Sequence, residues 1–102
     1  MDDTKPKYEH TVMLVDDEPG ITKAIQRILR REGLQILTSE DGPRALDMLK
    51  NRDSMISLII SDQRMPGMTG AQFLEKAREI VPDAIRFLLT GYSEMEAIIQ
   101  AV

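Results

Sequence analysis

The chain alternates between two kinds of segment, and this alternation limits the possible folds more than any other feature of the sequence. Short apolar runs occur at 11–15, 34–39, 55–61 and 85–89. Between them, apolar residues recur every three or four positions, which is the period of a helix with one buried face. Short apolar runs of this kind predict strands buried on both faces. Strands alternating with helices predict an α/β domain with a parallel sheet and right-handed crossovers.

Four helices are expected in this frame, each following a strand. The first has its apolar stripe from Ile21 to Leu29, and Gly33 is a plausible stop just beyond it. The second opens at Asp41 and the third carries a stripe that starts at Phe73. A fourth opens near Ser93, which is a suitable N-cap. The strand at 34–39 is more polar than the others and is expected at an edge of the sheet.

Composition sets the broad class. A chain of 102 residues forms one domain, and 42% apolar with 29% charged residues is ordinary for a globular protein. The net charge of −4, with scattered Lys and Arg, argues against direct nucleic-acid or membrane binding. The absence of Cys excludes disulfides and thiolate metal sites. Residues 1–10 are expected to be a polar leader and 11–102 the domain, in a cytoplasmic protein.

Three carboxylates follow two of the predicted strands. Asp16 and Asp17 come directly after the first strand, and Asp62 directly after the third. In a doubly wound sheet of order 2-1-3-4-5, strands one and three are neighbours, and ligands bind beyond their carboxyl ends. The three carboxylates are therefore expected to converge. Taken singly, each also suits helix capping or turn formation, so the joint placement carries the argument.

Converging carboxylates need something to neutralise their charge. Like charges a few ångströms apart do not all stay ionised unaided, and Mg²⁺ is the hard cation that suits an all-oxygen cluster. A carboxylate beside such an ion can also act as a nucleophile toward a phosphoryl group. Asp62 is the better candidate because it follows a central strand and precedes a loop rich in Pro and Gly.

At this point residues 12–102 resemble the receiver domain of bacterial two-component response regulators. Three ordered motifs carry the resemblance: Val12–Glu18, Asp62–Gly70 and Leu88–Tyr92. The family implies a flavodoxin-like α/β fold with strand order 2-1-3-4-5. It also implies a phosphoacceptor, Asp62, that takes a phosphoryl group from a sensor histidine kinase or phosphotransfer protein.

The resemblance implies further roles, residue by residue. Asp16, Asp17 and Asp62 would bind Mg²⁺ together with the backbone carbonyl of Arg64. Thr90 would be the switch hydroxyl that turns toward the phosphoryl oxygen; alone, a Thr after a strand is more often a cap or turn residue. Such a domain is a signalling module rather than an enzyme, apart from weak self-dephosphorylation, and it acts on an effector domain elsewhere in the parent chain.

The sequence departs from the family after the fourth strand. A receiver normally has a fifth strand, a following lysine and a fifth helix, and none of these is found before Val102. The apolar strand at 85–89 would then form a sheet edge, and an apolar edge invites pairing with another chain. The sequence therefore predicts self-association through this strand, as a homodimer or by exchange of elements between chains. The alternative is that the sequence is a piece of a longer protein whose native fold includes the missing elements.

Two other functions are compatible with parts of this pattern. One is a phosphorylation-independent interaction or dimerisation module that keeps the receiver fold. The other is a Mg²⁺-dependent phosphohydrolase that also uses an aspartyl phosphate. The phosphohydrolases place a second Asp two residues after the nucleophile, whereas Asp62 is followed by Gln63 and Arg64. That spacing argues against the phosphohydrolase.

Overall fold

The protein is described by a computed structural model that covers residues 10–53 and 55–89. Its strands are β1 (Thr11–Val15), β2 (Gln35–Ser39), β3 (Ile56–Asp62) and β4 (Ile85–Leu89). Its helices are α1 (Pro19–Arg30), α2 (Gly42–Lys50) and α3 (Gly70–Ile80). The predicted fourth helix and Thr90 lie outside the described residues. Within the described ranges, no helix is both long and apolar enough to cross a membrane.

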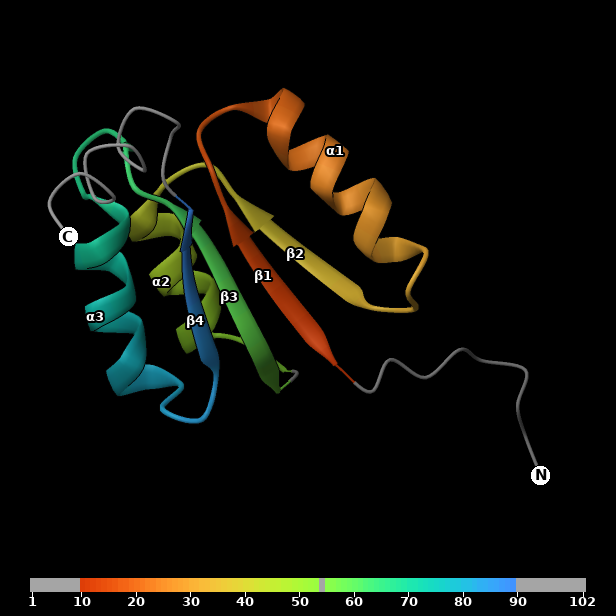
Figure 1. Cartoon of the computed structure of the whole chain (residues 1–102). Helices are drawn as coiled ribbons and strands as arrows, with labels where there is room; N and C mark the ends of the chain where they lie inside the picture. Colours follow the sequence, from red (N-terminus) through yellow and green to blue (C-terminus); the bar gives the residue numbers. More distant parts are fainter. Residues whose placement is uncertain (1–9, 54, 90–102) are drawn as a thin grey trace, which may run out of the picture.

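The strands form one parallel sheet in the order β2-β1-β3-β4, which confirms the predicted topology as far as β4 (Figure 1). All four point the same way, so their carboxyl ends lie together at the top of the view in Figure 1. As expected, the more polar β2 lies at one edge. β4 is the outermost strand on the other side of the described sheet.

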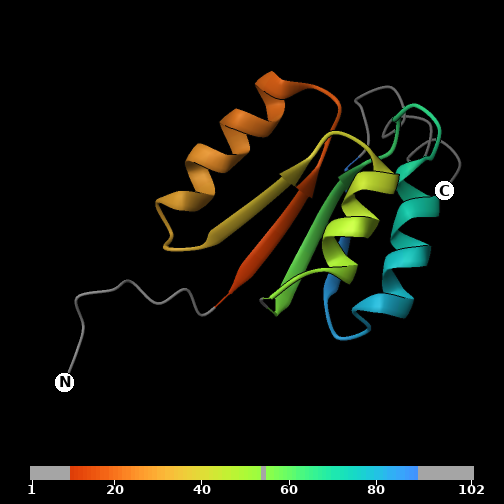
Figure 2. The ribbon, with the colours of Figure 1, turned by 180° about the vertical axis from the view of Figure 1, so that it is seen from behind.

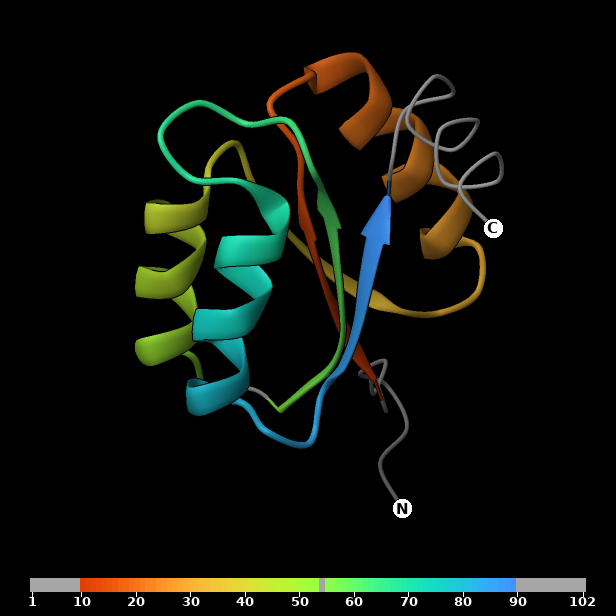
Figure 3. The same cartoon turned by 60° about the vertical axis from the view of Figure 1, so that its left-hand side comes forward.

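The helices lie on both faces of the sheet. Helices α2 and α3 pack side by side on one face (Figure 2), and α1 lies on the opposite face (Figure 3). The main core lies under α2 and α3. Its largest fully buried side chains include Phe73, Met13, Leu49 and Ile59. Burial of such side chains is the main source of stability in a domain of this size.

Helix α1 differs from its prediction. Its apolar stripe was expected to be buried, but no residue of α1 is buried and Ile28 is 62% exposed. The helix contacts β2, and it begins at Pro19, two residues before the predicted stripe. A helix that packs on an edge strand covers less of its stripe than one centred over a sheet. Gly33 takes a positive φ of 76° after the helix ends, as expected for a residue in a helix-terminating turn.

Candidate functional site

The carboxyl end of β1 carries the first two residues of the candidate site. The strand is buried along its whole length, and the chain leaves it at Asp16. The Asp16 backbone N–H donates to the carbonyl oxygen of Ser39 at 3.0 Å, which extends the β1–β2 pairing by one residue. The Glu18 backbone N–H donates to Asp16 Oδ1 at 2.8 Å. Asp16 is therefore fixed in its main chain and in one side-chain oxygen, just before α1 begins.

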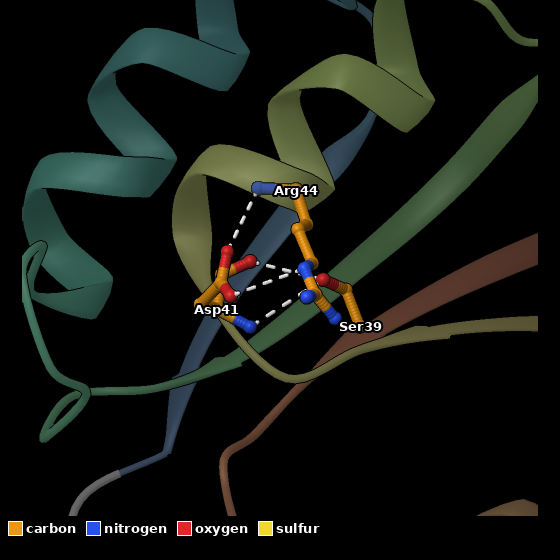
Figure 4. A network of polar contacts seen from close by, with 3 residues as sticks. All are labelled: Ser39, Asp41 and Arg44. Carbon is orange, nitrogen blue, oxygen red and sulfur yellow. Dashed lines mark hydrogen bonds and ion pairs between the residues drawn. The ribbon is translucent and has the colours of Figure 1, made fainter.

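The neighbouring corner, between β2 and α2, supports this arrangement (Figure 4). The Ser39 hydroxyl donates to the Asp41 carbonyl oxygen at 2.9 Å. The Asp41 side chain caps α2 by accepting from the Arg44 backbone N–H at 2.8 Å, and its Oδ2 lies 3.7 Å from Arg44 Nε. A capped helix start holds the end of β2, and with it the carbonyl that anchors Asp16, in one position.

The carboxyl end of β3 supplies the third carboxylate. Asp62 is the last residue of the strand rather than the residue after it, because β3 runs one residue later than predicted, from Ile56 to Asp62. Pairing with β4 extends to this position, where Asp62 lies opposite Leu89. The side chain is half-buried. A residue still held in the ladder is positioned more rigidly than one in the following loop.

The three predicted carboxylates do converge. Asp16, Asp17 and Asp62 each offer an oxygen, and these oxygens lie within 4.8 Å of one another. Asp16 is 4% exposed, Asp62 is half-buried and Asp17 is exposed, so the cluster opens outward on the Asp17 side. Beside it lies a depression of about 530 Å³ whose lining includes Asp17, Gln63 and Arg64. A small ligand can therefore reach the cluster from solvent.

The electrostatics of the cluster favour a cation. Burial raises the pKa of Asp16 above its usual value, and the Glu18 N–H partly opposes this. The charges of Asp62, Asp17 and Glu18 raise the Asp16 pKa further. A divalent cation among the three carboxylates would remove the cause of that repulsion. The donor set, made only of carboxylate oxygens with an open side for water, suits Mg²⁺.

Two residues of the site were missed as such from the sequence. Gln63 is bonded to both α3 and the end of β4, whereas the sequence marks it only as a member of the Asp62–Gly70 motif and assigns it no role. Gly70 was read only as part of a loop and a motif, yet its Cα lies against the carbonyl group of Asp62. Arg64, whose backbone carbonyl is the fourth predicted ligand, lies in the lining of the depression.

Comparison with known proteins identifies the family of this chain. A sequence profile of the response regulator receiver domain matches residues 12–102. The hydrogenase transcriptional regulatory protein HoxA of Cupriavidus necator is 39% identical over 92 residues, which is 90% of this chain. The match covers 18% of HoxA, so this chain spans only a small part of the length of that relative.

Solved structures give the same result. The response regulator protein TrrA of Thermotoga maritima, in complex with Mg²⁺ and BeF, is similar with a TM-score of 0.76 and 33% identity. The similarity covers 90% of this chain and 78% of that one. A complex of the histidine kinase ThkA with TrrA is similar with a TM-score of 0.70 and 36% identity, over 81% of this chain and 70% of the other.

Proposed function

The chain belongs to the response regulator receiver domain family, and from that premise we propose that it accepts a phosphoryl group on Asp62 from a histidine kinase or phosphotransfer protein, with Mg²⁺ bound. The observation that carries the proposal is the convergence of three carboxylates within 4.8 Å at the ends of two neighbouring strands. A capping or turn role for each residue separately does not require that convergence.

The proposed Mg²⁺ ligands are Asp16, Asp17, Asp62 and the backbone carbonyl of Arg64. When bound, Mg²⁺ supplies positive charge that offsets both the carboxylates and the oxygens of an incoming phosphoryl group. Asp16 is held by the Glu18 N–H through one oxygen, which leaves its other oxygen for the ion. Asp17 lies on the exposed side, where ion and donor arrive.

The proposed transfer is a simple substitution at phosphorus. A carboxylate oxygen of Asp62 forms the new O–P bond while the P–N bond to the donor imidazole breaks. The electron pair of the broken bond stays on the imidazole nitrogen, which takes up a proton from solvent, so that neutral histidine is regenerated. The product is an aspartyl phosphate, which replaces one negative charge by about two.

Thr90 is proposed as the hydroxyl that responds to the new charge. It follows Leu89, whose carbonyl oxygen accepts from the Gln63 backbone N–H at 3.2 Å. The chain just before Thr90 is thus bonded to the residue just after Asp62. We propose that this response reaches an effector domain in the parent chain, and that the receiver itself is not an enzyme beyond slow self-dephosphorylation.

The proposal is tested by incubating the protein with acetyl phosphate and Mg²⁺ and measuring its intact mass. We expect the mass of one phosphoryl group to be added to the wild-type protein and none to Asp62→Asn, which keeps the shape and removes the nucleophile. EDTA should prevent the addition. As a control, Asp83→Asn changes an exposed carboxylate before β4, at the opposite end of the sheet, and should leave it unchanged.

No adduct on wild-type protein would refute the phosphoacceptor role, as would an equal adduct on Asp62→Asn. Transfer from a purified histidine kinase autophosphorylated with labelled ATP is the second arm, because it tests the proposed donor class directly.

A second candidate is an interaction or dimerisation module that does not depend on phosphate. The observation in its favour is the exposure of β4, where Ile85 is 65% and Phe87 is 57% exposed. The two candidates separate on one measurement. If the chain is a phosphate-independent interaction module, Asp62→Asn should leave its binding to partner chains unchanged. If it is a phosphoacceptor, treatment with a phosphodonor should change partner binding in wild type and have no effect on partner binding in Asp62→Asn.

A further inference from the structure

Gln63 connects β3, β4 and α3 next to the candidate site. Its backbone N–H donates to the Leu89 carbonyl oxygen at the end of β4, at 3.2 Å. Its backbone carbonyl oxygen accepts from the Gly70 N–H at 3.0 Å, and its side-chain Oε1 accepts from the Ala71 N–H at 2.9 Å. The residue directly after Asp62 is therefore bonded to the end of β4 and twice to the start of α3.

The N-terminus of α3 explains why the side-chain bond matters. The first four N–H groups of a helix have no partner within it. They are the N–H groups of Thr69, Gly70, Ala71 and Gln72. The capping box satisfies two of them, because Gln72 N–H donates to the Thr69 hydroxyl at 3.1 Å and Thr69 N–H donates to Gln72 Oε1 at 3.0 Å. Gln63 accepts from the other two, those of Gly70 and Ala71. Thr69 binds α3 to its own preceding loop, whereas Gln63 binds it to the strand that carries Asp62.

Close packing makes this junction stiff. A Cβ on Gly70 would overlap the carbonyl oxygen of Asp62 and would lie 2.8 Å from Leu88 Cδ1. The first residue of α3 thus lies directly on the main chain of Asp62, with a β4 side chain beside it. Farther along, Phe73 and Ala77 are fully buried in the core. Because the two main chains are in direct contact, a displacement of the Asp62 backbone would be transmitted to α3.

We propose that Gln63 is a positioning residue that couples Asp62 to the N-terminus of α3, through the hydrogen bond from Ala71 N–H to its side-chain oxygen. The proposal rests on the proposed phosphoacceptor function and adds an output route to it. A charge change at Asp62 shifts the end of β3; the main-chain bond of Gln63 carries the shift to β4, and its side chain carries it to α3.

The coupling role of Gln63 can be distinguished by experiment from a role in stabilising the fold. Ala71 is exposed, so water can replace the Gln63 oxygen as the acceptor and the helix does not need this bond in order to form. Loss of the bond should therefore leave the fold intact and loosen only the connection. Gln63→Met has a similar length without the amide oxygen, and Gln63→Glu keeps an acceptor at the same place. The pair differs in the one feature that the proposal uses.

The experiment uses ¹⁵N-labelled full chain and amide spectra, with the thermal melting curve of each variant as the check on folding. In the absence of ligand, we expect the Ala71 amide to exchange roughly three to ten times faster in Gln63→Met than in wild type, and at nearly the wild-type rate in Gln63→Glu. On addition of Mg²⁺ and beryllofluoride, a mimic of the phosphoryl group, amide shifts from 70 to 73 should change in wild type. Those changes should fall to less than half in Gln63→Met and return in Gln63→Glu.

Each outcome decides something. Equal shift changes over 70–73 in wild type and Gln63→Met would overturn the coupling and leave the phosphoacceptor role standing. Unchanged Ala71 exchange in Gln63→Met would also overturn the coupling. No response of wild-type protein to Mg²⁺ with beryllofluoride, together with an unchanged mass after acetyl phosphate, would overturn the phosphoacceptor role and the coupling with it.

Discussion

At the scale of single residues, the site combines a destabilising charge with a close backbone contact. Asp16 is the most buried of the three carboxylates, and its pKa is raised mainly by that burial. Gly70 allows the main chain of α3 to approach that of Asp62. The buried charge of Asp16 lowers the stability of the metal-free fold, and the close contact at Gly70 leaves no room for a larger side chain. Each feature leads to a prediction about a single substitution.

Asp16→Asn should stabilise the metal-free protein. A carboxyl group whose pKa is higher in the folded than in the unfolded state makes folding less favourable as pH rises through the interval between those two values. Above that interval the carboxylate is charged in both states and the cost is present, and the amide removes it while keeping an Oδ1 acceptor for Glu18 N–H. We expect the melting temperature in EDTA to rise by a few degrees at pH 7 and to change little at pH 3.

In the presence of Mg²⁺, wild type should have the higher melting temperature of the two proteins. An ion that binds only the folded state stabilises it in proportion to the logarithm of its concentration over the dissociation constant. We expect Mg²⁺ to raise the melting temperature of wild type and to have little effect on Asp16→Asn. A lower melting temperature for Asp16→Asn than for wild type, in EDTA at neutral pH, would contradict the inference that the Asp16 charge destabilises the metal-free fold.

Gly70→Ala should destabilise the protein although alanine is the better helix former. The added methyl meets the Asp62 carbonyl and Leu88, and overpacking of this kind costs roughly 1–3 kcal/mol. The matched control is Gly20→Ala in α1, where a Cβ meets no atom within 4 Å. That change should be neutral or stabilise by up to about 1 kcal/mol. Urea unfolding midpoints measure both, and equal effects would refute the argument from close contact.

At the scale of elements, the three helices within the described residues are held in different ways. Helices α2 and α3 have side-chain caps, from Asp41 and Thr69, and both bury apolar residues against the sheet. Helix α1 has no side-chain cap hydrogen bond at Glu18 and no buried residue. Tertiary packing supplies most of the stability of a helix this short, so α1 should be the least stable of the three.

Amide hydrogen exchange tests this ranking. We expect amides in the middle of α1, such as that of Ile25, to exchange roughly tenfold or more faster than those of Leu46 and Leu49 in α2, because local opening of α1 exposes little buried surface. Equal protection in the two helices would contradict the ranking and would indicate that α1 is covered in solution.

Prediction from sequence succeeded where one local pattern decides the outcome. The run Thr11–Val15 has one plausible structure, and β1 has those bounds. The convergence of Asp16 and Asp62 followed from topology alone. It failed where tertiary packing decides: the stripe of α1 is apolar, yet its burial depends on what else covers that face. The role of Gln63 was not predictable because a side-chain bond across eight residues leaves no periodic signal.

At the scale of the whole molecule, the two sides of the described sheet differ. β2 is half-buried and contacted by α1 and α2. β4 is apolar yet largely exposed, with Ile85, Phe87 and Leu88 all accessible, and α3 contacts it. Among the described residues, no strand pairs with the edge of β4 that faces away from β3, and an exposed apolar edge is a template for pairing with another chain.

We therefore expect this 102-residue chain to self-associate through β4 at high micromolar concentration. Phe87→Glu should shift the population toward monomer in a sedimentation velocity experiment. Met55→Glu is the control, because Met55 is 82% exposed but lies before β3 and away from the open edge. A clean wild-type monomer at that concentration would contradict the prediction, and an equal effect of Met55→Glu would remove β4 as its cause.

The position of β1 between β2 and β3 has a consequence for a chain that is still folding. β2 pairs with β1 and not with β3, so the sheet is joined only when the first strand inserts between elements made later in the sequence. Asp62 can lie at the end of a formed β3–β4 pair while Asp16 and Asp17 are still distant. A phosphodonor that requires all three carboxylates should therefore not react with a partly folded chain. The ability to accept a phosphoryl group then arises only when the fold is complete.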